Sequence, residues 1–266
     1  MKEFLGFGGY TRPAEGFMSW QHLTFVTSLV VIMIALAFFL GKRNKTRSER
    51  EKNFVLIISA ILIDAVEIFK IVVICMRSED GDAWTRLLPL FLCSIQLITI
   101  PLAAFTKGRI KEASLDFVLM FGILGALLGT YGAAQNYGCY PVMSIDNVAS
   151  GITHTISGFA SLYIAFSGMT SMKKKNIPIS LGILSGVCIT AYVVNILVDY
   201  NYMFLMRGDG TPYDIFYNLV GGNPVLYPIV VVGLFFIYIT AFYWIYFKVT
   251  KKAFAEEEKT LQTVKI

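Results

Sequence analysis

Seven long apolar segments alternate along the chain with short breaks that are polar or contain glycine and proline. Each apolar segment has about 20 residues, the length that an α-helix needs to cross a hydrocarbon core of about 30 Å. We therefore predict seven transmembrane helices, at about 22–41, 53–76, 87–106, 115–133, 149–170, 178–198 and 225–248. Their spacing leaves no room for a soluble domain, so we predict an all-α transmembrane helical bundle in which residues 1–266 form a single transmembrane domain.

The composition supports a membrane setting. Of the 266 residues, 56% are hydrophobic and 15% are charged, and the mean hydropathy is +0.63, whereas about a quarter of the residues in a soluble domain are charged. The first twenty residues contain Glu3, Arg12, Pro13 and Glu15 and lack a continuous apolar run. We therefore expect the first transmembrane helix to be retained, and not removed with a signal peptide.

Lysine and arginine are unevenly divided between the two sides of the predicted bundle. The N-terminal stretch and the loops on its side contain 5 of them, the opposite loops and the C-terminal tail contain 17, and Lys70 lies within a predicted helix. Because cytoplasmic loops are enriched in basic residues, we predict a multi-pass protein of the cell membrane, with its N-terminus outside and its C-terminus inside. The basic residues behind the net charge of +5 lie in short loops and in the C-terminal tail, where they can contact anionic lipid headgroups. We therefore expect membrane lipids and no nucleic acid as partners.

The second apolar segment carries three ionisable side chains, Asp64, Glu67 and Lys70. Such groups cost several kcal/mol in hydrocarbon unless they are paired or hydrated. Neighbours in this series are three residues apart and therefore share a helix face. Two interpretations stay open: an internal ion pair that fixes helix packing, and a proton or ion relay through the bundle.

The third segment combines two prolines with a thiol and an amide. Pro89 is expected in the first turn of its helix, where a missing N–H is harmless, and Pro101 is expected to kink the helix further along. Cys93 and Gln96 lie one turn apart on one face. A single cysteine in a membrane helix is usually a small apolar filler, but Gln96 makes this face more polar.

The fifth segment has a polar stripe formed by Ser150, His154, Ser157 and Ser161. His22 lies near the edge of the first helix, so His154 is the one histidine expected well inside the bundle. Cys93 and His154 are about six and five residues into their predicted helices, which places both roughly 8–9 Å below the outer boundary. If the two helices are neighbours, the histidine can act as a base for a cysteine nucleophile in acyl transfer; otherwise His154 only hydrogen-bonds a neighbour.

The sixth segment ends in polar residues at the same level. Asp199 is a candidate to orient His154 as the third member of a triad, or it is an ordinary residue at the end of a helix. The polar side chains of this layer that can support a site are Gln96, Ser157, Asn195, Asp199, Asn201 and Tyr202.

The four cysteines are far apart and form no CxxC pair, so we expect no metal and no cofactor. Cys75 and Cys139 both fall toward the outer face, where a disulfide between them is the minority alternative to two free thiols.

The motifs LPLFLCSIQL in the third segment and NYMFL at 201–205, together with the interior His154, resemble the YwaF-type integral membrane proteins. The resemblance covers nearly the whole chain. That family includes a eukaryotic transmembrane acyltransferase that loads polyunsaturated chains onto ether phospholipids, and it is distantly similar to the androgen-induced-type membrane hydrolases of fatty-acid esters. The resemblance implies a phospholipid or fatty-acyl substrate.

The same resemblance implies catalytic roles for two residues. The eukaryotic acyltransferase uses a cysteine after a Leu-Pro-Leu motif and a histidine further downstream; the matching residues here are Cys93 and His154, which are 61 positions apart. One departure is Phe91, which stands where many relatives have a histidine two residues before the cysteine.

Two functions from different classes follow. In an intramembrane acyltransferase or hydrolase, Cys93 attacks a lipid acyl ester, His154 is the base, and Gln96, Asn195 or Asn201 donates a hydrogen bond to the oxyanion. In a transporter or substrate-binding protein without covalent chemistry, a cavity near the membrane middle forms around the carboxylates of the second segment. A scaffold whose polar residues only pack the bundle is a third alternative.

Overall fold

The computed structural model describes residues 1–79, 81–170 and 172–264. Its long helices are α2 (Trp20–Asn44), α3 (Glu49–Arg77), α5 (Gly108–Tyr131), α7 (Ile145–Ser167), α8 (Ile177–Val198) and α10 (Leu226–Val264). The short α-helices are α1 (Lys2–Leu5), α4 (Gln96–Phe105), α6 (Ala134–Cys139) and α9 (Tyr213–Leu219), and the 3-10 turns are η1 (Ala83–Arg86), η2 (Cys93–Ile95), η3 (Lys174–Asn176) and η4 (Tyr202–Phe204). None of the described residues forms a strand, which confirms the all-α prediction.

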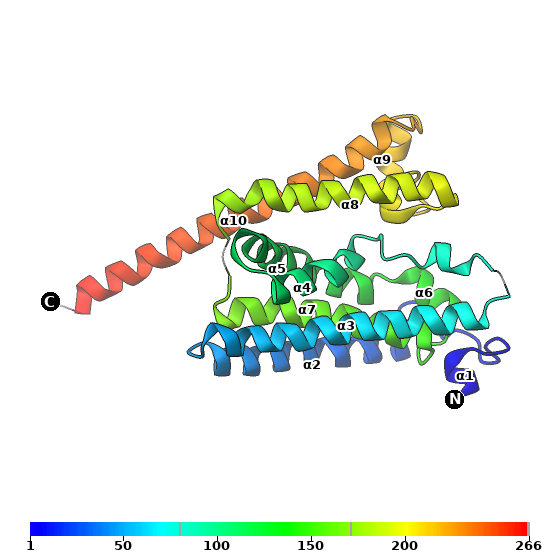
Figure 1. The fold of residues 1–266 in the computed structure, drawn as a ribbon, viewed down its shortest axis with the longest axis horizontal. Helices are drawn as coiled ribbons and strands as arrows, with labels where there is room; N and C mark the ends of the chain where they lie inside the picture. The colour runs from blue at the N-terminus through cyan, green and yellow to red at the C-terminus, as the bar shows by residue number, and fades with distance from the viewer. Residues whose placement is uncertain (80, 171, 265–266) are drawn as a thin grey trace.

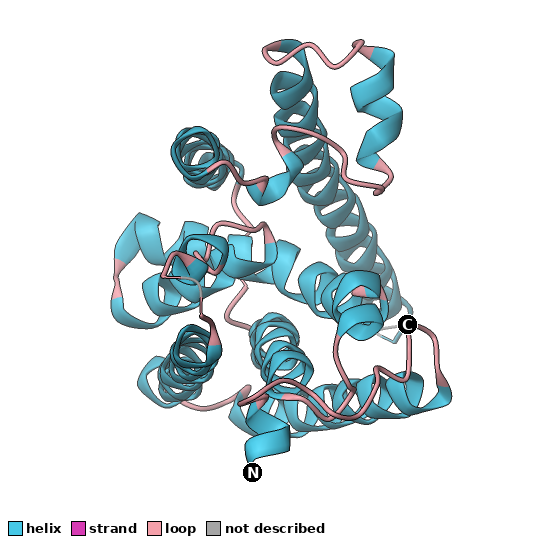
Figure 2. Ribbon diagram, turned by 90° about the vertical axis from the view of Figure 1, so that its right-hand side faces the viewer, coloured by secondary structure: helices cyan, strands magenta, loops and turns pink. Residues whose placement is uncertain are grey.

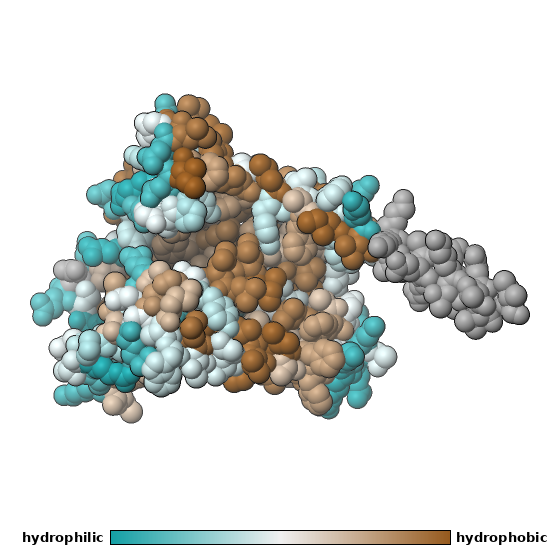
Figure 3. Space-filling model, turned by 180° about the vertical axis from the view of Figure 1, so that it is seen from behind, coloured by the Kyte–Doolittle hydropathy of each residue, from teal (hydrophilic) through white to brown (hydrophobic). Residues whose placement is uncertain are grey.

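Among the described residues, four helical stretches are long and apolar enough to cross a membrane: Trp20–Asn44, Gly108–Cys139, Lys174–Val198 and Leu226–Thr250. A further apolar stretch, Cys93–Phe105, is shorter. Figure 3 shows apolar surface across the middle of the molecule and polar surface toward its two ends. Helices α3 and α7 have 29 and 23 residues, which is long enough to span a hydrocarbon core, but they are not among these four apolar stretches.

Helix α7 is the centre of one half of the molecule. It packs against α5, α2 and α3, and α4 lies against both α3 and α5. Helices α8 and α10 form a further layer over α5, with α9 at its end (Figure 1), and Figure 2 shows the same bundle from its end. Because α7 is surrounded by other helices, it meets protein groups on several sides, and polar residues in it can find partners there.

Small residues let α5 and α7 approach closely. A Cβ on Gly122 would lie 2.6 Å from the carbonyl oxygen of Ser157. The side chain of Ser157 donates a hydrogen bond to the carbonyl oxygen of Gly122, at 3.5 Å, and that of Ser161 donates to Leu119 at 2.8 Å. Two members of the predicted polar stripe therefore hold α7 against α5, as is common between membrane helices.

The third predicted helix is shorter than expected. Helical structure begins at Cys93 and not at residue 87, and Pro89 lies in irregular backbone instead of a first helical turn. A residue before proline is pushed toward extended conformations, and irregular backbone at membrane depth needs partners for its polar groups. Tyr202 supplies them: its hydroxyl accepts a hydrogen bond from the N–H of Leu88, at 3.1 Å, and donates one to the carbonyl of Thr85.

A buried ionic cluster closes the end of the bundle that carries the N-terminus. The guanidinium of Arg77, at the end of α3, donates to both carboxylate oxygens of Asp146, at 2.7 and 2.5 Å. The hydroxyl of Tyr10 donates to the same carboxylate at 2.6 Å. Burial and the Asp146 carboxylate raise the pKa of Tyr10 to about 12. This cluster, which the sequence did not reveal, ties the N-terminal stretch to α3 and α7.

Candidate functional site

Cys93 opens the short helical stretch formed by η2 and α4. The backbone before it is irregular, so the thiol is half-buried at a helix N-terminus and not within a continuous helix. The N–H groups of a first helical turn have no intrahelical partner, and the helix dipole favours negative charge there.

Two glycines of α5 place Cys93 and His154 on one helix face. An added Cβ on Gly125 would lie 3.7 Å from the Cβ of Cys93, and an added Cβ on Gly129 would overlap the imidazole ring of His154. Because Gly125 and Gly129 are one helical turn apart, the Cβ of Cys93 and the His154 ring lie within about 12 Å of each other. The structure therefore brings α4, α5 and α7 together around these two side chains.

The depth of His154 differs from the expected value. Helix α7 begins at Ile145, where Ser144 caps it, four residues before the predicted start. His154 is consequently nine residues into its helix, about 13 Å from the helix end. Cys93, in contrast, opens its helical stretch instead of lying about six residues into it, so the observed helix bounds do not give the two residues the equal depth that was predicted.

Gln96 lies one turn after Cys93 and is fully buried, with 0% of its surface exposed. Its Oε1 accepts a hydrogen bond from the hydroxyl of Thr99 at 3.1 Å. Its Nε2 has no hydrogen-bond partner among the described residues. A buried amide donor without a partner costs about 1–3 kcal/mol, so this N–H group is available to a bound molecule at a position close to the thiol.

The charged residues of α3 lie in the same region. Lys70 and Glu67 form an ion pair, with Nζ and Oε1 2.6 Å apart and both side chains mostly buried. The charges of both residues act electrostatically on Cys93, and that of Lys70 also acts on His154. The ion pair supports the packing interpretation of this series. Asp64 is half-buried, and no ion-pair partner for it occurs within the described ranges.

Asn195 and Asn201 are occupied by the loop after α8. The amide of Asn195 exchanges two hydrogen bonds with the backbone of Tyr202, at 3.0 and 2.6 Å. The amide of Asn201 donates to the carbonyl of Arg207 and to Asp209, both at 2.7 Å. These side chains hold the loop that contains Tyr202. Of the three predicted oxyanion donors, only Gln96 has an amide nitrogen without any hydrogen-bond partner among the described residues.

Asp199 and Phe91 each have an environment of their own. Asp199 is exposed at the end of α8, in the left-handed conformation with φ 49°, which supports its interpretation as a helix-end residue. The ring of Phe91 packs against Tyr202, with centroids 5.1 Å apart, and also contacts Tyr200 and Phe204. Phe91 thus fills an aromatic cluster between the irregular segment and the loop after α8.

The ring nitrogens of His22 are occupied by backbone groups, and the cysteines form no disulfide. His22 accepts a hydrogen bond from the N–H of Met18 at Nδ1, and its Nε2 lies 3.1 Å from the carbonyl of Thr130. All four cysteines are free, so the disulfide between Cys75 and Cys139 does not form in this structure.

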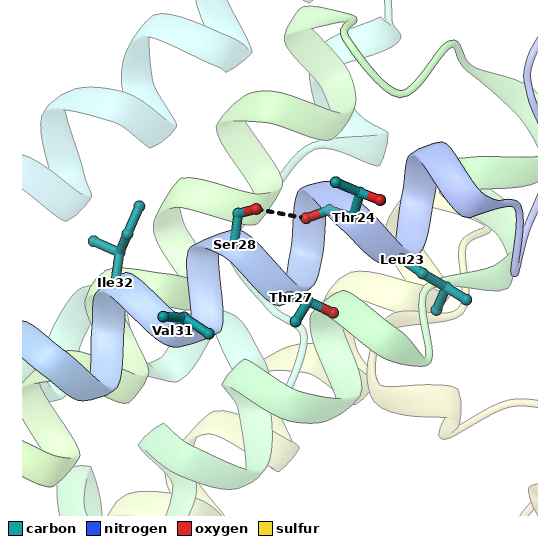
Figure 4. Close-up of a pocket in the computed structure, with 6 residues that line it drawn as sticks. All are labelled: Leu23, Thr24, Thr27, Ser28, Val31 and Ile32. Atoms are coloured by element: carbon teal, nitrogen blue, oxygen red, sulfur yellow. Dashed lines mark hydrogen bonds between the residues drawn. The ribbon is translucent and has the colours of Figure 1, made fainter.

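Among the hollows at the surface of the described residues, two are lined by α2. One, of about 570 Å³, follows a single face of α2; Figure 4 shows its residues, with the Ser28 hydroxyl donating to the carbonyl of Thr24 at 2.7 Å. The other, of about 1130 Å³, is lined by α2, α3 and α7. Neither is lined by Cys93, Gln96 or His154.

Comparison with known proteins gives one match. The model of the TMEM164 family, a family of transmembrane proteins, matches residues 17–247, which include all three of those site residues. No curated protein and no solved structure matches the chain.

Proposed function

The chain belongs to the TMEM164 family of transmembrane proteins, and on that premise we propose that it is a multi-pass membrane enzyme that transfers acyl chains between lipids through Cys93 and His154. The observation that carries the proposal is that the Cβ of Cys93 and the imidazole of His154 lie against adjacent turns of α5, at Gly125 and Gly129. The resemblance of the Cys93 segment to YwaF-type proteins supports a lipid acyl ester as the substrate.

The first half-reaction makes a thioester. His154 takes the proton of the Cys93 thiol, and the sulfur attacks the ester carbonyl of the donor lipid. The carbon–sulfur bond forms, the ester carbon–oxygen bond breaks, and His154 returns the proton to the lysolipid oxygen. In the second half-reaction, the hydroxyl of an acceptor lysolipid gives its proton to His154 and attacks the thioester carbonyl. The ester carbon–oxygen bond forms, the carbon–sulfur bond breaks, and His154 returns the proton to the Cys93 sulfur. With water as acceptor, the same steps amount to hydrolysis.

Gln96 supports this chemistry as the oxyanion donor. Negative charge develops on the carbonyl oxygen as sulfur attacks, and a fixed donor aimed at that oxygen stabilises the transition state. The unpartnered Nε2 of Gln96 is such a donor, one helical turn from Cys93. The Glu67–Lys70 ion pair fixes charged groups beside the site without a net charge of its own.

The proposed topology has seven crossings with the N-terminus outside. Besides the four apolar stretches, it assigns α3 and α7 to the membrane, together with a third crossing made of α4 and the irregular segment before it. The division of basic residues, 17 against 5, supports this orientation. The acyl chains then lie among helices in the outer half of the bilayer of the cell membrane.

Lipid profiles test the proposal. Cells expressing the wild type, Cys93→Ala or His154→Ala at equal protein levels are compared for the acyl composition of each phospholipid class. We expect remodelling in the wild type alone. Equal remodelling by all three proteins would show that the two residues have no chemical role.

A further inference from the structure

A groove runs along the surface between α2 and α3, at the end of the bundle that carries the basic loops. Both helices pack on α7, and α7 forms the floor of the groove through Ile156 and Phe159. The walls are apolar over most of their length, with Leu36 on α2 and Leu62 on α3 among the lining residues. Those two leucines are 48% and 49% exposed, so the apolar part of the groove lies open at the surface.

The mouth of the groove is basic. Arg43, Arg47 and Arg50 line it, and Glu51 is the acidic residue that lines it with them. The Glu51 carboxylate accepts hydrogen bonds from the backbone and hydroxyl of Ser48, which cap α3, and it lies 3.6 Å from Arg47 in an exposed pair. Within the described ranges, neither Arg43 nor Arg50 has an ion-pair partner. The mouth of the groove thus carries more positive than negative charge, and the apolar walls begin next to it.

The groove has the length of one lipid leaflet. From Arg50 to Leu62 it follows twelve residues of α3, about 18 Å, which compares with half of a hydrocarbon core of about 30 Å. An arginine fork matches a phosphate geometrically, and apolar walls that open toward lipid suit an acyl chain. The positive charge and the length of the groove therefore fit a phospholipid whose headgroup carries no cation to balance its phosphate.

We propose that this groove binds one phospholipid with an anionic headgroup, taken from the leaflet on the basic side of the bundle. Its phosphate lies between Arg43, Arg47 and Arg50, and an acyl chain lies along the apolar walls toward Leu62. The site is separate from the proposed acyl-transfer site, because neither Cys93 nor His154 lines it. Under the proposed topology it faces the cytoplasmic leaflet, where anionic lipids attract basic residues.

Lipid binding to the full chain in detergent tests the proposal. The Cys93→Ala variant is titrated with phosphatidylglycerol and with phosphatidylcholine of identical chains, and bound lipids are counted by native mass spectrometry. Since a basic side chain at an anionic surface contributes about fivefold in affinity, replacing the three arginines with glutamine is expected to weaken phosphatidylglycerol binding about 100-fold. The charge-matched control replaces Lys45, Lys107 and Lys174, which do not line the groove, and is expected to retain wild-type affinity.

A second variant tests the apolar part without changing charge. The double variant Leu36→Trp/Leu62→Trp fills the apolar part of the groove and is expected to weaken phosphatidylglycerol binding. Glycerol phosphate, which has no acyl chain, is expected not to compete with phosphatidylglycerol for the groove. Thermal unfolding of each variant checks that it is folded. Equal affinity for the two lipids, an unchanged arginine variant, or competition by glycerol phosphate would each overturn the proposed lipid site.

Discussion

Gly125 and Gly129 stand one turn apart on α5 and differ in what they touch. The first leaves ordinary contact distance to Cys93, whereas the second is covered by the His154 ring. The position of the imidazole therefore depends on the absence of a side chain at residue 129. The sequence singled out Cys93 and His154 as candidates through their predicted depth, but the glycine contacts of the two residues depend on helix packing and have no local signal.

Gly129→Ala is expected to displace the His154 ring, and a misplaced base lowers the rate about 100-fold. Gly125→Ala is the matched control, because its new Cβ would lie 3.7 Å from Cys93 and alanine favours a helix by up to about 1 kcal/mol. The measurement is acyl transfer at equal amounts of folded protein. Equal activity of the two variants would remove His154 from the mechanism.

Gln96→Met separates chemistry from folding. Removing a buried donor that has no partner is expected to leave the thermal unfolding midpoint unchanged or raised, because the Thr99 hydroxyl keeps the carbonyl of Ile95 as an acceptor at 3.2 Å. Loss of an oxyanion donor lowers the rate about 10²–10³-fold. Acyl-transfer rates and unfolding midpoints of the variant and the wild type are compared. A variant with full activity would show that another group holds the oxyanion.

At the scale of elements, the break before α4 decides where the thiol lies. The apolar run around Pro89 is typical of a helix start, and the sequence alone predicts a helix from residue 87. The hydrogen bonds that stabilise the irregular alternative come from Tyr202, which is 114 positions from Leu88. A partner so distant leaves no pattern in the local sequence, whereas α2, α5, α8 and α10 follow directly from their apolar length.

Tyr202→Phe is expected to destabilise the protein by about 1–3 kcal/mol, because the buried polar groups of Thr85 and Leu88 lose their partner. Tyr192→Phe is the control, since its hydroxyl makes one hydrogen bond, of 3.3 Å, to Pro224. Thermal unfolding and proteolysis of the segment 83–92 are measured for both variants. Unchanged protection of this segment in Tyr202→Phe would contradict the anchoring role.

Across the whole molecule, the cluster of Tyr10, Arg77 and Asp146 joins three distant parts of the chain. Arg77 and Asp146 are 69 positions apart, so the sequence shows two ordinary charges at helix ends and gives no sign of their pairing. The charge count along the loops, in contrast, is a property of the whole sequence and predicts an orientation directly.

Tyr10 gives the protein a pH dependence at alkaline pH. Its folded pKa of about 12 exceeds the ordinary value of about 10, so the neutral phenol stabilises the fold fully below pH 10. That contribution is lost as the pH rises from 10 to 12. The difference in unfolding midpoint between the wild type and Tyr10→Phe is therefore expected to shrink over this range. A constant difference would mean that Tyr10 titrates normally.

The proposed orientation makes Cys139 accessible from outside. Cys139 is exposed at the end of α6, between the fourth and fifth crossings. Because Cys75 is half-buried and also lies toward the outer face, the test uses a Cys75→Ser background. A membrane-impermeant maleimide added to intact cells is expected to label Cys75→Ser and not the Cys75→Ser/Cys139→Ser double variant. Labelling that appears only after the cells are opened would reverse the orientation.

Acylation of Cys93 is the most direct test of the proposed chemistry. The purified protein is incubated with a phospholipid of defined acyl chain and without an acceptor, and its intact mass and acylated peptide are measured. We expect the mass of one acyl group, attached to Cys93 and released by hydroxylamine, in the wild type, and no adduct in Cys93→Ala or His154→Ala. Formation of transfer product while Cys93 stays unmodified, or with Cys93→Ala, would contradict a thioester mechanism.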